Sequence, residues 1–331
     1  MRRLLPPAEE ITTGIRSGSR VLLGQAITLI ESTRSDHQAL AQNVIARLMK
    51  EVPVDSTTLR VGITGAPGVG KSTFIEALGV HLLEKGRRVA VLAIDPTSTI
   101  SRGSILGDKT RMDRLSVAAG AFVRPSPSGD SLGGVARKTR ETILLVEAAG
   151  YDTVLVETVG VGQSEVAVHR MTDMFVLLLL PGAGDELQGI KRGIVEMADL
   201  LVVNKADGEH LNLARQAQRH YSNAIHLLPA KPNDWTPQVL TCSAQNGQGI
   251  PELWAAITAY YAHTQQNNSF AENRRQQARY WLKEALQNGL QAMFQVHADT
   301  QAMLGKLEPE VLAGRLSPFA AAEQVLQSFK K

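Results

Sequence analysis

Residues 65–72 read Gly65-Ala66-Pro67-Gly68-Val69-Gly70-Lys71-Ser72 and match the pattern G-x-x-x-x-G-K-[ST] in full. They follow a short apolar run, residues 59–64, that we interpret as a strand, and they open a helical pattern over residues 72–83. In such a strand–loop–helix context, backbone N–H groups and the positive end of the helix cradle phosphate oxygens. The sequence therefore predicts a P-loop in which residues Gly65 to Thr73 bind a nucleotide.

Two side chains of this loop carry the expected chemistry. A lysine at the place of Lys71 reaches the β- and γ-phosphates of a nucleoside triphosphate and neutralises charge during transfer. A hydroxyl at the place of Ser72 is a ligand of Mg²⁺. We therefore predict a Mg²⁺-dependent nucleotide hydrolase in which Lys71 is catalytic and Ser72 is a metal ligand.

The fold class follows from the pattern on both sides of the loop. Short apolar runs alternate with amphipathic helical stretches; the runs are residues 59–63, 89–94, 153–156, 174–180 and 200–203. Strands that are apolar on both faces and separated by helices are typical of a parallel sheet covered by helices. The prediction is an α/β P-loop NTPase with a mostly parallel central sheet flanked by helices.

Helical patterns precede and follow this region, so we expect three parts: a helical extension over residues 1–57, the P-loop domain over 58–264 and a helical arm over 265–331. Ser35 and Gln38 suggest a capping box at the start of an N-terminal helix. In the arm, Leu282, Leu286, Leu290 and Phe294 recur every four residues, and residues 307–331 carry a second helical pattern. The arm either packs on the main domain or pairs with a second subunit, and we favour a homodimer.

One motif indicates which nucleobase the site binds. It reads Asn204-Lys205-Ala206-Asp207 and directly follows the run at residues 200–203. An aspartate carboxylate accepts two hydrogen bonds from N1–H and the N2 amine of guanine, whereas adenine would leave it unpaired. Polar sites of this kind reject the wrong partner by factors on the order of 10⁴. Cys242, Ser243 and Ala244 stand where GTPases present a backbone N–H to the guanine O6, with Cys242 as a packing residue rather than a nucleophile. The predicted substrate is GTP and the product GDP.

Glu157-Thr158-Val159-Gly160 occupies the place of the D-x-x-G element of GTPases, with a longer acid than usual. We expect Glu157 to be catalytic and a Mg²⁺ ligand. Val161 follows, where Ras-like enzymes place the glutamine that orients the attacking water. Intrinsic hydrolysis should therefore be slow and stimulated by a partner.

Asp95 ends the run at residues 89–94, at the sheet edge where ligands bind in such folds. We favour a catalytic and metal-binding role over a helix cap. Further residues are candidates for switch segments that respond to the nucleotide: Asp108, Arg111, Gly160, Asp185, Glu186 and Lys191. For Asp108 a solvated turn remains the alternative, and for residues 181–193 an ordinary loop.

Composition and charge limit the classes of function and the locations that the sequence allows. The chain has 331 residues, a net charge of +3 and a single cysteine. The charges are scattered, which favours a solvated surface over nucleic-acid binding. The longest apolar run is far short of the ~20 residues that span a bilayer, so no membrane insertion is expected. One thiol builds no disulfide framework, which favours a cytoplasmic location.

The motifs together resemble the MeaB/ArgK family of G proteins, which includes the methylmalonic aciduria type A protein. The resemblance extends over essentially the whole chain and rests on residues 65–73, 93–96, 107–112, 132–134, 157–165 and 204–207. The Glu157 motif matches this family's own version of the element.

The resemblance implies a dimeric GTPase, similar to metallochaperone GTPases, that acts as a chaperone for an adenosylcobalamin-dependent acyl-CoA mutase, above all methylmalonyl-CoA mutase. No D-x-H-x-x-G motif occurs, so no directly bound cobalamin is expected. Three alternatives remain: a metallochaperone-like GTPase for another metalloenzyme, an ATPase or kinase of basic amino-acid transport, and a scaffold. Few Cys and His ligands disfavour the first, the guanine motif disfavours the second, and intact Lys71 and Ser72 disfavour the third.

Overall fold

The structure is a computed structural model that describes residues 5–50, 57–94, 112–125, 132–158, 164–182 and 192–329. The chain divides into two compact units, Met1–Asn273 and Arg274–Lys331. The domain bounds expected from the sequence, with breaks after residues 57 and 264, stay a prediction. Among the described helices, none combines the length and the apolar character that crossing a membrane requires.

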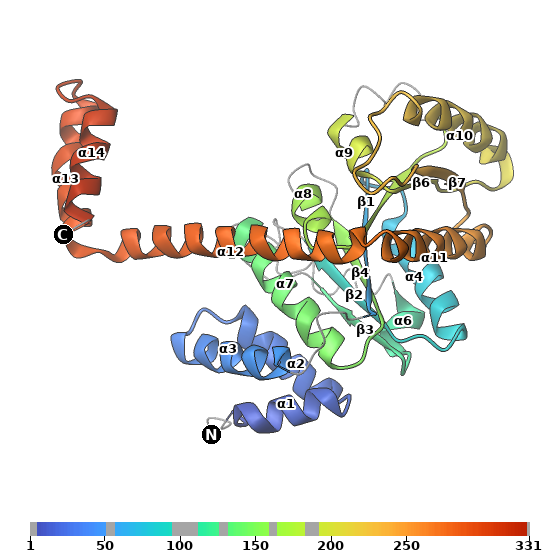
Figure 1. Cartoon of the computed structure of the whole chain (residues 1–331), viewed down its shortest axis with the longest axis horizontal. Helices are drawn as coiled ribbons and strands as arrows, with labels where there is room; N and C mark the ends of the chain where they lie inside the picture. The colour runs from blue at the N-terminus through green and yellow to red at the C-terminus, as the bar shows by residue number, and fades with distance from the viewer. Residues whose placement is uncertain are drawn as a thin grey trace. The chain divides into compact units, whose positions relative to one another are not determined.

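The first unit is built on a seven-stranded sheet in which all described pairings are parallel, in the order β3-β2-β4-β1-β5-β6-β7 (Figure 1). The strands are β1 (Leu59–Gly65), β2 (Val89–Ile94), β3 (Ala121–Arg124), β4 (Thr153–Thr158), β5 (Met174–Leu179), β6 (Leu200–Val203) and β7 (Gln238–Thr241). The predicted parallel α/β sheet is confirmed. The strands β3 and β7 are absent from the predicted apolar runs, because each is a four-residue edge strand of which at most two residues are buried.

Helices cover both faces of the sheet. One face packs against α4 (Lys71–Glu84), α6 (Asp113–Val117) and α11 (Ile250–Gln266). The other face packs against α7 (Leu132–Ala148), α8 (Ser164–His169), α9 (Arg192–Met197) and α10 (Leu211–Ile225). A short 3-10 helix, η2 (Gly208–His210), precedes α10. Because both faces are covered, five strands are buried along nearly their whole length, which explains their apolar runs: β1, β2, β4, β5 and β6.

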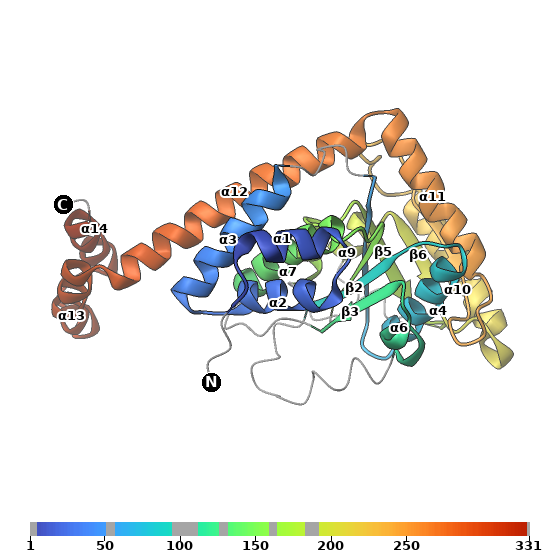
Figure 2. The same ribbon diagram turned by 90° about the horizontal axis from the view of Figure 1, so that it is seen from below.

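The N-terminal helices α1 (Ala8–Arg16), α2 (Arg20–Glu31) and α3 (Ser35–Met49) pack on one another and on α7 (Figure 2). An ion pair between Glu31 and Arg124 joins α2 to the edge strand β3. The capping box expected at Ser35 is wrong. The N-cap of α3 is Arg34, which has the extended backbone that a cap requires, and the side chain of Gln38 donates to the carbonyl of Ser32 instead.

The second unit consists of α12 (Ser269–Val296) from Arg274 onward, α13 (Ala298–Leu312) and α14 (Pro318–Phe329). α13 packs on α14, and the ring of Phe329 lies 5.5 Å from that of Phe294. The helical pattern expected over residues 307–331 is therefore interrupted. The break comes after Leu312, where Gly314 has a φ of +69° and Pro318 begins the next helix.

Candidate functional site

The P-loop joins β1 to α4 near the middle of the sheet, because β1 lies between β4 and β5. The helix begins at Lys71, and Gly70 before it has a left-handed backbone with a φ of 94°. A Cβ atom on Gly70 would lie 2.8 Å from the Nδ2 of Asn204. Both the conformation and the close approach therefore require glycine at this position.

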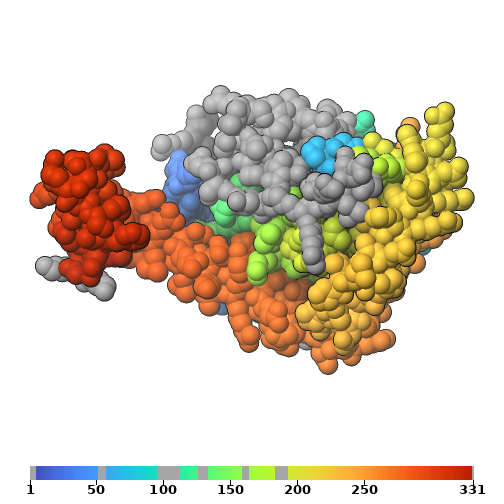
Figure 3. Space-filling model, turned by 90° about the horizontal axis from the view of Figure 1, so that it is seen from above, coloured from blue at the N-terminus to red at the C-terminus, as the bar shows by residue number. Residues whose placement is uncertain are grey.

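Lys71 is buried, and its Nζ donates to the carbonyls of Gly65 at 2.8 Å and Ala66 at 3.2 Å. Burial lowers the pKa of Lys71, and the negative charges of Glu157 and Glu165 act in the opposite direction. Pro67, Gly68 and Thr73 are exposed, and light-blue atoms of this part of the chain reach the surface in Figure 3. Two hydrogen bonds thus fix the ammonium group of Lys71, while neighbouring residues of the loop are exposed to solvent.

Ser72 and Glu157 lie side by side, at the start of α4 and near the end of β4. The Ser72 hydroxyl donates to Oε1 of Glu157 at 3.1 Å. Beside them, the hydroxyl of Thr158 donates to that of Thr64 at 2.8 Å and links β4 to β1. A hydroxyl and a carboxylate are hard oxygen donors of the kind that Mg²⁺ prefers, so the two side chains fit this ion. They are two of the three metal-ligand candidates named from the sequence, and the third is Asp95.

The loop after β6 is bonded directly to the P-loop. The side-chain amide of Asn204 donates to the carbonyl of Val69 at 2.9 Å, and Nζ of Lys205 donates to the carbonyl of Gly68 at 2.8 Å. Lys205 has a φ of 58°, which is uncommon for a residue other than glycine. Hydrogen bonds thus join the P-loop to the Asn204 motif, although the two lie far apart in the sequence. The sequence pattern did not reveal this connection.

The loop after β7 completes this arrangement. The backbone N–H of Ala244 donates to Oδ1 of Asn204 at 3.1 Å, and the Ser243 hydroxyl donates to Oδ2 of Asp207. Cys242 is buried in the core beside Asn204. Burial raises the pKa of its thiol to about 12, so Cys242 is protonated near neutral pH. The structure brings together Asn204, Lys205, Asp207 and residues 242–244 as the sequence analysis grouped them.

The seven remaining candidates lie outside the described residues: Asp95, Asp108, Arg111, Gly160, Asp185, Glu186 and Lys191. Glu165 was not named as a site residue from the sequence, although it is buried and its negative charge opposes the lowering of the Lys71 pKa. The signal that could have found it is an acid shortly after the Glu157 motif, in a short helix that also contains Val166 and Val168.

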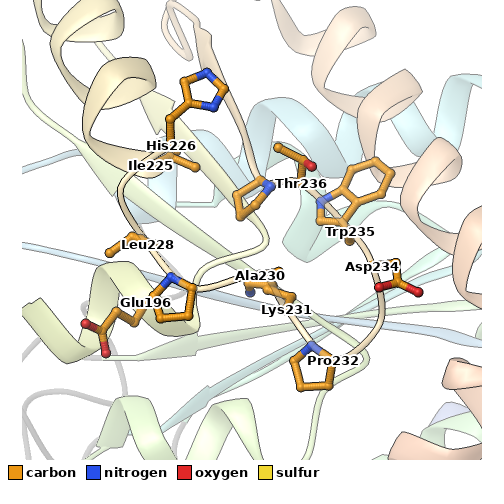
Figure 4. Close-up of a pocket in the computed structure, with 12 residues that line it drawn as sticks. Glu196, Ile225, His226, Leu228, Ala230, Lys231, Pro232, Asp234, Trp235 and Thr236 are labelled. Carbon is orange, nitrogen blue, oxygen red and sulfur yellow. The ribbon is translucent and has the colours of Figure 1, made fainter.

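A hollow lies away from these loops, between α9 and the long loop after α10 (Figure 4). Its volume is about 500 Å³, and its lining includes Leu228, Lys231, Pro232 and Trp235. The ammonium of Lys231 is bound to Asp199 at 2.6 Å, and the indole N–H of Trp235 donates to the carbonyl of Asp199 at 2.9 Å. These bonds hold the loop to the start of β6, opposite the strand end that carries Asn204.

Comparison with known proteins gives a consistent result. A family model described as "Methylmalonyl Co-A mutase-associated GTPase MeaB" matches residues 23–299. A "Putative GTPase" of Caulobacter vibrioides is 52% identical over 314 residues, which cover 95% of each chain. A "Methylmalonic aciduria type A homolog, mitochondrial" of Mus musculus is 46% identical over 329 residues, 97% of this chain and 79% of the relative.

Among solved structures, a crystal structure described as "LAO/AO transport system kinase" superposes with a TM-score of 0.78 at 37% identity. The match covers 99% of this chain and 100% of that one.

Proposed function

The chain belongs to the MeaB family of methylmalonyl-CoA mutase-associated GTPases, and we propose that its nucleotide site is formed by the P-loop and the two loops bonded to it. The chain is a P-loop GTPase. In the proposed site, residues 65–73 hold the phosphates, and Asn204, Lys205, Asp207 and residues 242–244 surround the base. The observation that carries the proposal is the pair of hydrogen bonds from Asn204 and Lys205 to the carbonyls of Val69 and Gly68.

These bonds matter because they fix the distance between the phosphate loop and the base-reading loop. The carboxylate of Asp207 would accept from N1–H and the N2 amine of guanine, while Ser243 and Ala244 complete the loop around the base. Asp207 already accepts a hydrogen bond from Ser243, so the orientation of its carboxylate is set before a ligand arrives. A preorganised acceptor of this kind favours guanine over adenine.

We propose that Lys71 neutralises charge on the transferred phosphoryl group, and that Ser72, Asp95 and Glu157 hold Mg²⁺. When bound, Mg²⁺ would supply positive charge that offsets the negative charge of the phosphates. The hydrogen bond between Ser72 and Glu157 supports this assignment for two of the three residues. We further propose that Asp108, Arg111, Gly160, Asp185, Glu186 and Lys191 belong to segments that respond to the bound nucleotide.

The test is a titration with fluorescent GDP and ATP analogues in the presence of Mg²⁺. Wild type is expected to prefer guanine strongly, and Asp207→Ala is expected to lose a large part of that preference, on the order of a hundredfold or more. Glu209→Ala is the matched control, because it removes an exposed acid two residues away. Equal or preferred adenine binding by wild type would contradict the proposal and favour the transport-kinase function suggested by the description of the solved relative.

We also propose a biological role: a chaperone for an adenosylcobalamin-dependent acyl-CoA mutase, with slow intrinsic GTP hydrolysis that the mutase accelerates. Val161 in place of a water-orienting glutamine supports the slow rate, and the family description supports the partner. The measurement is GTP turnover by the purified protein with and without methylmalonyl-CoA mutase. Fast turnover by the protein alone would contradict the slow rate, and lack of stimulation would favour another metalloenzyme as the partner.

Two further features belong to the proposal. We propose a homodimer through the second unit, supported by apolar side chains that α12 leaves exposed. We also propose a cytoplasmic location, supported by the single buried thiol of Cys242, which forms no disulfide within the chain.

A further inference from the structure

Two buried threonine hydroxyls form a hydrogen bond at the end of the sheet that carries the proposed site. Thr64 is the next-to-last residue of β1, Thr158 is the last residue of β4, and both are buried. Oγ1 of Thr158 donates to Oγ1 of Thr64 over 2.8 Å. Burying a hydroxyl without a partner is costly, so this bond allows both side chains to lie in the interior.

Each threonine is next to a residue of the proposed site. Thr64 precedes Gly65, whose carbonyl accepts a hydrogen bond from the ammonium group of the P-loop lysine. Thr158 follows Glu157, whose Oε1 accepts from the hydroxyl of Ser72. The bond between the threonines therefore links the strand that leads into the P-loop with the strand that carries a proposed Mg²⁺ ligand.

The threonine bond lies beyond the last backbone pair that joins β1 to β4. In the register of these parallel strands, Ile63 is the last residue of β1 that pairs with β4, and its partner is Glu157. On the other edge of β4, pairing with β2 continues to Thr158, which lies across from Ile94. The end of β4 is thus held to β2 by the backbone ladder and to β1 by the two hydroxyls.

The threonines and the ligand candidates lie on opposite faces of the sheet. Successive side chains of a strand point to opposite faces. Glu157 points toward Ser72 at the start of α4, so Thr158 points away from α4. Gly62, which shares its face of β1 with Thr64, lies against α8. Thr158 therefore acts on the ligand pair only through the backbone of Glu157.

We propose that Thr158 is a positioning residue for the Mg²⁺ site. Its bond to Thr64 holds the end of β4 at the distance from the P-loop at which Glu157 and Ser72 can both bind the ion. The inference rests on the proposed nucleotide and Mg²⁺ site. Mg²⁺ requires near-ideal octahedral geometry with ligands at about 2.0–2.1 Å, so a small displacement of one ligand weakens binding. Interactions that orient metal ligands typically change metal affinity by about 10–100-fold.

A purely structural role makes a different prediction. If the two hydroxyls only stabilise the sheet, then removing either one lowers the free energy of unfolding and changes GDP binding equally with and without Mg²⁺. If Thr158 positions Glu157, then removing its hydroxyl weakens GDP binding mainly when Mg²⁺ is present. The quantity that separates the two roles is the Mg²⁺ effect, defined as the Kd for GDP in EDTA divided by the Kd in Mg²⁺.

The experiment measures the Mg²⁺ effect with a fluorescent GDP analogue, together with the denaturation midpoint, for wild type and five variants. Thr158→Val and Thr64→Val each remove one hydroxyl at nearly constant shape, the double variant removes both, and Thr158→Ser keeps a hydroxyl. Thr264→Val is the matched control, because Thr264 is also buried and its hydroxyl donates to the carbonyl of Tyr260 within α11.

We expect Thr158→Val and Thr64→Val each to reduce the Mg²⁺ effect by on the order of tenfold. The double variant should show no further reduction, because both changes remove the same bond. Its denaturation midpoint should lie close to that of wild type, since two apolar groups of the same shape leave no buried hydroxyl unpaired. Thr158→Ser and Thr264→Val are expected to retain the wild-type Mg²⁺ effect.

An unchanged Mg²⁺ effect in Thr158→Val and in the double variant would overturn the inference, as would an equal reduction in Thr264→Val. If wild type binds no GDP, then the proposed nucleotide site fails. If wild type binds GDP without any effect of Mg²⁺, then the proposed metal site fails. Both of these results concern wild type and so differ from an unchanged Mg²⁺ effect in the variants.

Discussion

Asn204 is the residue at which three loops of the site meet. Its amide donates to the P-loop carbonyl of Val69, and its Oδ1 accepts from the backbone N–H of Ala244. Only 2% of Asn204 is exposed. Asn204→Ala would leave buried backbone groups without their partners, at a cost of about 1–3 kcal/mol in the free energy of unfolding. We expect a lower denaturation midpoint and weaker binding of GDP, measured by chemical unfolding and titration.

Asn43→Ala is the control for this prediction, because Asn43 lies on the exposed surface of α3. It should leave both the denaturation midpoint and GDP binding near the wild-type values. Wild-type behaviour of Asn204→Ala would contradict the view that this residue holds the loops together.

Cys242 gives a prediction about pH. Burial raises the pKa of its thiol from 9.0 to about 12 in the folded protein. As the pH rises from 9 toward 12, the unfolded chain releases this proton and the folded chain retains it, so the thiol contributes a loss of stability over that interval. Cys242→Ala should make the fall in unfolding free energy above pH 9 less steep, as measured by denaturant titrations at several pH values. An unchanged slope would show that the folded thiol ionises normally.

At the scale of residues, the sequence predicts which side chains bind a nucleotide better than it predicts which residues form hydrogen bonds with one another. The P-loop and the guanine motif can be recognised because phosphates and a purine base demand particular side chains at particular spacings. The bond from Asn204 to Val69 joins residues 135 positions apart, and no local pattern encodes such a contact. Glu165 was missed for a related reason, since its burial depends on how α8 packs against β1.

At the scale of elements, β1 and α7 are joined by a buried ion pair. The guanidinium of Arg60 donates to both oxygens of Glu147 at 2.6 and 2.8 Å, and the two side chains are 5% and 3% exposed. Glu147→Gln removes one charge and leaves the other buried, which typically costs about 3–5 kcal/mol. We expect a large decrease in the free energy of unfolding, measured by denaturant titration.

The same helix contains the control pair. Arg137 and Glu141 form an ion pair on α7 in which the arginine side chain is 55% exposed. Arg137→Ala should cost about 1 kcal/mol or less, because solvent screens an exposed pair. Similar losses for Glu147→Gln and Arg137→Ala would contradict the distinction between buried and exposed pairs in this helix.

The elements themselves are predictable where burial is uniform. Strands β1, β2, β4, β5 and β6 appear in the sequence as continuous apolar runs, because helices cover both faces of the sheet. The edge strands β3 and β7 are not among these runs, because both are short and only partly buried. The expected cap at Ser35 was wrong because cap geometry depends on the backbone of Arg34, which side-chain type alone does not determine.

At the scale of the whole molecule, periodicity predicts helices but not the surface that each helix covers. The repeat of Leu282, Leu286 and Leu290 indicated an apolar stripe, and in the second unit this stripe is exposed rather than packed. The sequence alone left two alternatives for it, the main domain or a second subunit. Packing within the second unit does not cover the stripe, and we keep the second alternative as the proposal.

The stripe leads to a prediction about assembly. Leu282, Leu286 and Leu290 are 63%, 59% and 57% exposed in the single chain. Covering such side chains stabilises an association by about 1.5–3 kcal/mol each, so a contiguous row of them favours an interface between subunits. The double variant Leu286→Glu/Leu290→Glu should weaken dimerisation by on the order of a hundredfold or more. Sedimentation velocity over a range of concentrations measures this change, and GDP binding should persist.

Leu227→Glu is the matched control, because Leu227 is 85% exposed in the first unit, in the loop after α10. The same charge placed there should leave the dimer intact, since the proposed interface lies in the second unit. A dimer that survives in Leu286→Glu/Leu290→Glu would place the interface elsewhere, and a wild type that stays monomeric at micromolar concentration would leave the stripe to a different partner. If the double variant loses the dimer and Leu227→Glu keeps it, then the exposed face of α12 contacts a second copy of the chain.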